Sequence, residues 1–306
     1  MNRRSLIVFG VVIAALLLIA FFTRQSNEQL VSTLLSGGWT TDAANGAVES
    51  ALRVVTRGTR FAARWNVNAP LAPDRLNVYI LRPGLQPEGR ALPARFASLL
   101  NNCAFAGAPN VVICDAQFLD DFSPAHGVRC FDRDPRARTN CERRNRTILL
   151  TWVLGHELGH IVNGDPPAHF GQSRLDEMVP SNSIAQSREL RADAFLIAHL
   201  RRDDKRMFEV VDYLIGLLNW ELSRKLKKVP YGVGILYDYT HKQDVQYATL
   251  GDHPEFVVRC VRMLDGAQLG DGLDYELHDL AAHMKVAPAP HGASAVAAAF
   301  FRRIFP

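Results

Sequence analysis

The sequence carries two histidines and a glutamate at a spacing that is typical of a zinc site. His156, Glu157 and His160 form an H-E-x-x-H motif. Residues four apart lie on one face of a helix, about one turn from each other, so both imidazoles can bind the same Zn²⁺. The glutamate between them lies beside the metal, where it can act as general base on a zinc-bound water. Two core histidines satisfied by hydrogen bonds are the alternative interpretation.

A second pair of acidic residues, Glu189 and Asp193, follows in an E-x-x-x-D arrangement. Their side chains are again one turn apart on one helical face. Asn163 and Pro166 occupy the positions where a metzincin would need glycine and histidine, so Glu189 is predicted as the third zinc ligand. Asp193 is predicted to accept a hydrogen bond from a ligating histidine and so to fix its tautomer. An exposed acidic face paired with neighbouring arginines is the alternative.

The two motifs together resemble the gluzincin zinc metalloproteases. The finer pattern resembles the HtpX/OMA-type members, which are relatives of the type-2 CAAX prenyl proteases. Residues 103–113 resemble that family's hairpin and edge strand, residues 189–193 its acidic helix segment, and residues 252–254 its T-H-P sequence. The likeness covers residues 95–265. It does not carry a substrate preference, because Cys103 replaces an asparagine, one hairpin glycine is missing, and a single hydrophobic segment replaces several.

These features predict a membrane-anchored zinc endopeptidase that binds one Zn²⁺ per chain and cleaves exported or envelope proteins. Glu157 takes a proton from the zinc-activated water and passes it to the leaving amine. Two other classes stay open: a catalytically weak, membrane-tethered chaperone or scaffold that keeps the zinc fold, and a zinc-dependent amidase acting on non-peptide amides. The intact Glu157 argues against the scaffold, because a purely structural zinc site has no use for it.

The reaction also needs a donor for the developing oxyanion. His253 is the catalytic candidate, because it precedes Pro254 at a predicted helix start, where the helix dipole disfavours the protonated imidazole. A simple helix N-cap role is the alternative for His253. Tyr231, Tyr237 and Tyr239 are rival donors.

The elements that must position these residues predict an α+β fold, a mostly helical zincin domain with a small sheet. Helices are predicted at 145–163, 187–201, 208–226 and 254–264, and strands at 75–81 and 111–116. Residues 118–144 are expected to be rich in loops. The strand at 111–116 is the predicted edge strand, which in zincins lies above the metal and pairs with the substrate backbone.

Gly155 and Gly159 stand four apart and immediately precede the two histidines. Each glycine inside a helix costs up to about 1 kcal/mol relative to alanine. We therefore expect another backbone, such as that of the helix carrying Glu189, to pack closely against this stripe. Incidental tolerance near a helix end is the alternative.

Four of the five cysteines fall into two pairs with equal spacing. Cys103 and Cys114 would close the hairpin before the zinc helix, and Cys130 and Cys141 would close a polar loop. Loops of this size give roughly 3 kcal/mol of stabilisation when cross-linked without strain. The pattern is typical of an oxidising compartment, although other pairings remain open. Cys260 is predicted to be a buried thiol.

An unbroken apolar run covers Leu6–Phe22. As a helix it spans about 25 Å, near the lower limit for crossing a bilayer. Arg3 and Arg4 precede it, so the N-terminus is expected in the cytoplasm and the catalytic domain in the periplasm. No small-x-small cleavage site follows, which favours an uncleaved signal anchor in the inner membrane over a removed signal peptide.

The chain of 306 residues divides into four predicted regions. Residues 1–24 form the anchor, 25–70 a helical linker, 71–275 the zinc metalloprotease domain, and 276–306 an Ala- and Pro-rich C-terminal segment. The hydrophobic fraction of 48% and moderate charge indicate a folded body. A net charge of +4 is mild and gives no case for nucleic acid. The expected partners are a protein or peptide substrate and the membrane.

Overall fold

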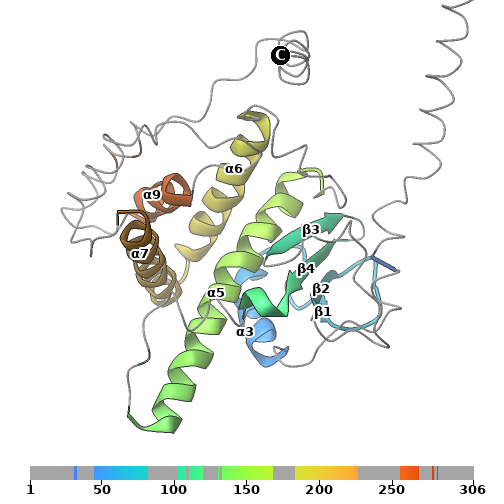
Figure 1. Cartoon of the computed structure of the whole chain (residues 1–306). Coiled ribbons are helices and arrows are strands. Elements are labelled where there is room, and N and C mark those ends of the chain that lie inside the picture. The colour runs from blue at the N-terminus through green and yellow to red at the C-terminus, as the bar shows by residue number, and fades with distance from the viewer. Residues whose placement is uncertain are drawn as a thin grey trace, which may run out of the picture.

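The computed structural model describes residues 31–32, 45–81, 102–107, 110–119, 130, 133–167, 183–226, 256–268, 278 and 281. The predicted α+β class is confirmed. The helices are α3 (Asn45–Val55), α5 (Pro135–Asn163), α6 (Ser183–Leu200), α7 (Asp204–Leu226) and α9 (Phe256–Ala267). The strands are β1 (Trp65–Val67), β2 (Leu76–Leu81), β3 (Cys103–Gly107) and β4 (Val111–Asp115). Helix α5 lies at the centre, with α6, α7 and α9 on one side and α3 and the sheet on the other (Figure 1).

The sheet has the strand order β1-β2-β4-β3. The pairs β1–β2 and β2–β4 are parallel, whereas β3 runs antiparallel to β4. The prediction that residues 111–116 form the edge strand is therefore wrong, because β4 is paired on both sides. Every residue of β4 is buried, as expected for a central strand covered on both faces. Within the described residues, β3 is the edge strand on this side.

Helix α3 and strand β1 belong to the same body as the rest, although residues 25–70 were expected to be a linker. Val48, Leu52 and Val55 of α3 are buried in one apolar cluster with Leu149 and Leu154 of α5. Strand β1 pairs with β2, so the predicted boundary at residue 70 falls inside the sheet. Burying the apolar face of α3 against α5 gives the central helix support on its sheet side.

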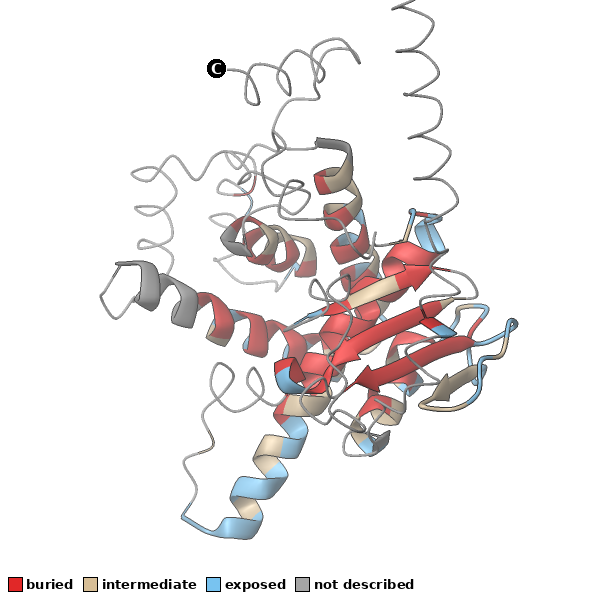
Figure 2. Cartoon of the chain, turned by 45° about the vertical axis from the view of Figure 1, so that its right-hand side comes forward, coloured by how far each residue is buried: buried red, intermediate tan, exposed pale blue. Residues whose placement is uncertain are grey.

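Helix α5 begins at Pro135, ten residues before the predicted start at residue 145. The Asp134 side chain accepts a hydrogen bond from the Arg136 N–H at 3.0 Å, and proline stands in the first turn. The Asp134 cap and the proline favour the start of a helix in a stretch whose polar composition predicted a loop. Figure 2 shows these first turns exposed and projecting from the buried body, which explains why the stretch lacks an apolar face.

The C-terminal end of α5 follows the predicted glycine stop. Gly164 adopts the left-handed conformation with a φ of 69°, which glycine takes without steric cost. The chain then turns back, and the Asp165 N–H donates to the His160 carbonyl at 2.9 Å. This turn brings Asp165 beside the H-E-x-x-H motif.

Both predicted disulfides are present. Cys103–Cys114 joins β3 to β4, and Cys130–Cys141 ties the preceding chain to the exposed turns of α5. Cys260 is a buried free cysteine, as expected. The predicted anchor at 1–24 and most of the C-terminal segment 276–306 lie outside the described residues. Among the helices of the described ranges, none combines the length and the apolar character needed to cross a membrane.

The two glycines of α5 let α6 approach very closely. A Cβ atom added to Gly159 would lie 2.8 Å from both the Cα and the carbonyl oxygen of Ala192 in α6. A Cβ on Gly155 would collide with the Leu196 side chain of the same helix. The expected backbone packing is therefore confirmed at Gly159, where a backbone cannot move aside as a side chain can.

We expect Gly159→Ala to lower the free energy of unfolding by about 1–3 kcal/mol, because the added methyl group overpacks the contact with Ala192. Gly46→Ala is the matched control, since a Cβ there meets no atom within 4 Å. Alanine at position 46 should leave stability unchanged or raise it by up to about 1 kcal/mol. Urea unfolding of the two variants measures the difference, and equal stability would contradict close packing.

Candidate metal centre

Three predicted ligands meet in the core between α5 and α6. The Nε2 atoms of His156 and His160 are 3.1 Å apart. Glu189 places Oε2 3.1 Å from the first of these nitrogens and Oε1 3.3 Å from the second. The three residues are 6%, 9% and 9% exposed. Helices α5 and α6 thus place three donor atoms around one point, as the motif spacing predicted.

This donor set fits a metal ion. Zn²⁺ binds imidazole nitrogen and carboxylate oxygen at about 2.0–2.2 Å, so tetrahedral ligand atoms lie roughly 3.3 Å apart. The observed separations of 3.1 to 3.3 Å match that spacing. In the part of the chain that the structure describes, this is the one group of histidine, cysteine and acidic side chains placed to hold a metal. Two imidazoles and one carboxylate leave a fourth position for water or substrate.

A carboxylate contacts the Nδ1 atom of each histidine. Asp193 lies 2.8 Å from Nδ1 of His156, which confirms the predicted contact. Asp165 lies 3.0 Å from Nδ1 of His160, a partner that the sequence analysis missed. A carboxylate on Nδ1 keeps the proton there and leaves the Nε2 lone pair facing the other ligands. Arg191 donates to the same Asp165 at 3.0 Å and balances its charge.

Arg259 of α9 pairs with acidic side chains of the site, and the sequence analysis missed it too. Its Nε and Nη2 atoms donate to the two carboxylate oxygens of Asp193, each at 2.9 Å. Its Nη1 lies 3.7 Å from Oε2 of Glu189. Such a bidentate contact fixes both the position and the orientation of the carboxylate. Helix α9 therefore supports the candidate metal-binding residues of α5 and α6 through one buried guanidinium.

Burial and charge shift the acidity of these groups in opposite directions. Burial raises the pKa of Asp193, but Arg259 and His156 outweigh it and lower that pKa to about 2. Burial and Arg259 lower the pKa of His156, yet Asp193 and Glu189 raise it to about 10. A metal ion at Nε2 would compete with a proton there, because it binds only the unprotonated nitrogen.

Glu157 lies beside the three donors without joining them. Its Oε2 accepts a hydrogen bond from the Phe105 N–H of β3 at 2.6 Å. Burial, together with the neighbouring Glu189 carboxylate, raises the pKa of this carboxyl above its usual value, although His156 and His160 oppose the shift. A carboxylate next to the metal group, buried and not itself a ligand, is suited to accept and return a proton.

His253 and the rival donors Tyr231, Tyr237 and Tyr239 lie outside the described residues.

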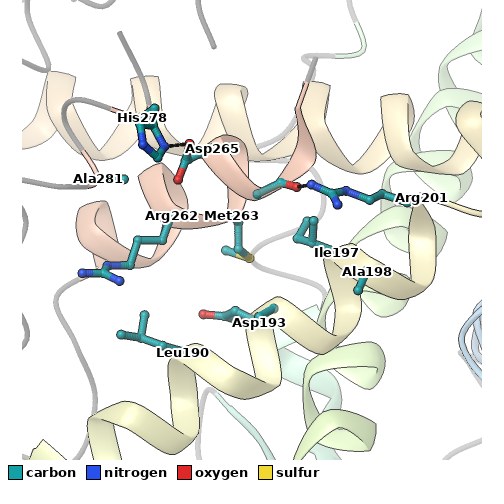
Figure 3. Close-up of a pocket in the computed structure, with 12 residues that line it drawn as sticks. Leu190, Asp193, Ile197, Ala198, Arg201, Arg262, Met263, Asp265, His278 and Ala281 are labelled. Atoms are coloured by element: carbon teal, nitrogen blue, oxygen red, sulfur yellow. Dashed lines mark hydrogen bonds and ion pairs between the residues drawn. The ribbon is translucent and has the colours of Figure 1, made fainter. Parts of the chain in front are cut away.

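A separate cavity of about 530 Å³ lies between α6 and α9, with Asp193 on its wall (Figure 3). The described residues that line it include none of the three metal-binding candidates, so its one link to the centre is Asp193.

No family model, curated protein or solved structure matches this chain.

Removing either carboxylate that contacts a histidine Nδ1 should weaken metal binding. We expect Asp165→Ala and Asp193→Ala each to lower zinc affinity by about 10- to 100-fold, because the ligating rings lose their orientation. Asp212→Ala, at an exposed position of α7, is the control and should keep the wild-type affinity. Competition with a chromophoric chelator measures the affinity. Wild-type affinity in Asp165→Ala would remove that residue from the centre.

Arg259→Met should destabilise the metal-free protein by about 3–5 kcal/mol, because Asp193 and Glu189 then keep buried charge without their cation. Arg259→Lys should cost less, since it retains the charge and loses the bidentate geometry. Arg53→Met is the control, because it removes a pair in which Arg53 is 69% exposed. That loss should stay below about 0.5 kcal/mol in denaturant unfolding. Equal losses at positions 259 and 53 would contradict the role of Arg259.

Proposed function

We propose that this protein is a zinc endopeptidase. The single observation that carries the proposal is the buried meeting of His156, His160 and Glu189, with Glu157 beside them and outside the ligand set. A purely structural zinc site has four closed ligands and no use for such a carboxylate. The H-E-x-x-H and E-x-x-x-D motifs, and their resemblance to HtpX/OMA-type proteases, support the same activity.

The residues of the site have separate roles in the proposed reaction. His156, His160 and Glu189 would hold Zn²⁺, which when bound supplies Lewis acidity for activating water and polarising a carbonyl. Glu157 accepts the proton of the attacking water and returns it to the leaving amine. Asp193 and Asp165 hold the ligating rings in the tautomer that the metal needs. Arg259 keeps Asp193 ionised and oriented, so it acts through that carboxylate.

The position of β3 favours a peptide substrate over a non-peptide amide. Strand β3 pairs with β4 on one side only, among the described residues, and contacts α5 beside Glu157. The backbone carbonyls on the unpaired side of an edge strand can accept hydrogen bonds from an extended peptide. A small amide has no need for such a partner.

The two disulfides support an oxidising compartment such as the periplasm. We propose that the apolar run Leu6–Phe22 anchors the chain in the inner membrane, with the catalytic domain on the exported side. Exported or envelope proteins would then be the substrates within reach.

The proposal is tested by measuring zinc content and peptide cleavage in the full-length protein and in Glu157→Gln. Both should bind one zinc, and the variant should cleave at least about 100-fold more slowly, because it lacks the proton acceptor. Glu49→Gln, at a half-exposed glutamate of α3, is the control and should cleave like the wild type.

Zinc binding without cleavage in any of the three proteins would favour the scaffold. Cleavage of a small amide but of no peptide would favour the amidase. A folded protein without zinc would overturn the site.

A further inference from the structure

The orientation of Phe105 follows from the hydrogen bonds of β3. Asn102 accepts from the Asp115 N–H at 2.9 Å, so its polar backbone groups face β4. Those groups alternate along an antiparallel strand, so the groups of Cys103 and Phe105 face away from β4. The Phe105 N–H is thus free of the sheet ladder and points towards α5, where it meets Glu157.

The Phe105 amide is well placed to hold a catalytic carboxylate. Among the described residues it is the one hydrogen-bond donor to Glu157, whose side chain is buried. A short bond from a fixed N–H to a charged oxygen is among the stronger contacts in proteins. The disulfide at Cys103, two residues before the amide, ties β3 to β4. The donor therefore has little freedom to move.

We propose that the backbone N–H of Phe105 is the positioning group of Glu157. It binds Oε2 and so directs the other oxygen, Oε1, towards the space beside the three metal-binding candidates. Strand β3 then has two roles: it pairs with a peptide, and it sets the orientation of the general base Glu157. This inference rests on the proposed peptidase function.

Two substitutions at one position separate the amide from the side chain. Phe105→Pro removes the N–H without breaking a ladder hydrogen bond, since this N–H faces away from β4, and its ring also excludes the Glu157 carboxylate from this position. Phe105→Ala also removes the phenyl ring but keeps the N–H. We expect kcat of Phe105→Pro to fall about 10- to 100-fold below that of Phe105→Ala, with KM and zinc content alike in both. Equal kcat in two zinc-loaded variants would overturn the proposal.

A second readout does not depend on activity. In protein labelled with ¹⁵N-phenylalanine, the Phe105 amide signal is identified by its loss in Phe105→Ala. A charged acceptor shifts that proton downfield, so Glu157→Ala should move it upfield. An unmoved signal would overturn the proposal even if the proline variant does not fold. If the wild type binds zinc but cleaves no peptide, the peptidase function fails, and the amide signal alone decides whether Phe105 holds Glu157.

Discussion

The site depends on one close contact between two helix backbones. Gly159 of α5 lies so close to the backbone of Ala192 in α6 that a Cβ atom at position 159 would overlap it. Gly159 precedes the candidate ligand His160, and Ala192 precedes Asp193, so the contact brings the two motifs together. A larger separation of the helices would move the Glu189 carboxylate away from both imidazoles. The close helix contact thus offsets the propensity cost of glycine within α5.

Burying this group creates a problem of charge. Glu189, Asp193, Asp165 and Glu157 are all less than a tenth exposed, and isolated buried carboxylates are costly. Arg259 pairs with Asp193, and Arg191 with Asp165, so two of the four carry their own cation. Glu189 lies near Arg259 and both histidines, and Glu157 rests on a backbone N–H. A divalent cation at the three donors would balance the charge that remains.

Local patterns were sufficient to predict much of the site. The motif spacing identified His156, His160 and Glu189, and the same helical period identified Asp193 as the partner of a ligating histidine. The two glycines predicted close helix packing, and the equal spacing of the cysteines predicted both disulfides. The spacing within each motif and within each cysteine pair is local, so sequence separation constrains the geometry. The meeting of the two helices was inferred from the combination of the two motifs and from the glycines.

The missed features depend on contacts between segments distant in sequence. Arg259 reaches Asp193 from another helix, and an arginine in an amphipathic helix ordinarily indicates a solvated face. The order of the strands, with β3 at the edge, follows from pairing across a long connection. Asp165 could have been found, because the glycine stop of α5 turns the chain back towards His160. The early start of α5 was missed because an exposed helical projection has no apolar period.

The most direct test of the metal centre is zinc-edge X-ray absorption of the zinc-loaded full-length protein. The geometry predicts a first shell of nitrogen and oxygen at about 2.0–2.2 Å, with two imidazole rings visible by their outer-shell scattering and no sulfur. The spectrum should be lost together with zinc in His156→Ala. A sulfur shell, or the same spectrum in that variant, would show that zinc binds elsewhere and would contradict the assigned centre.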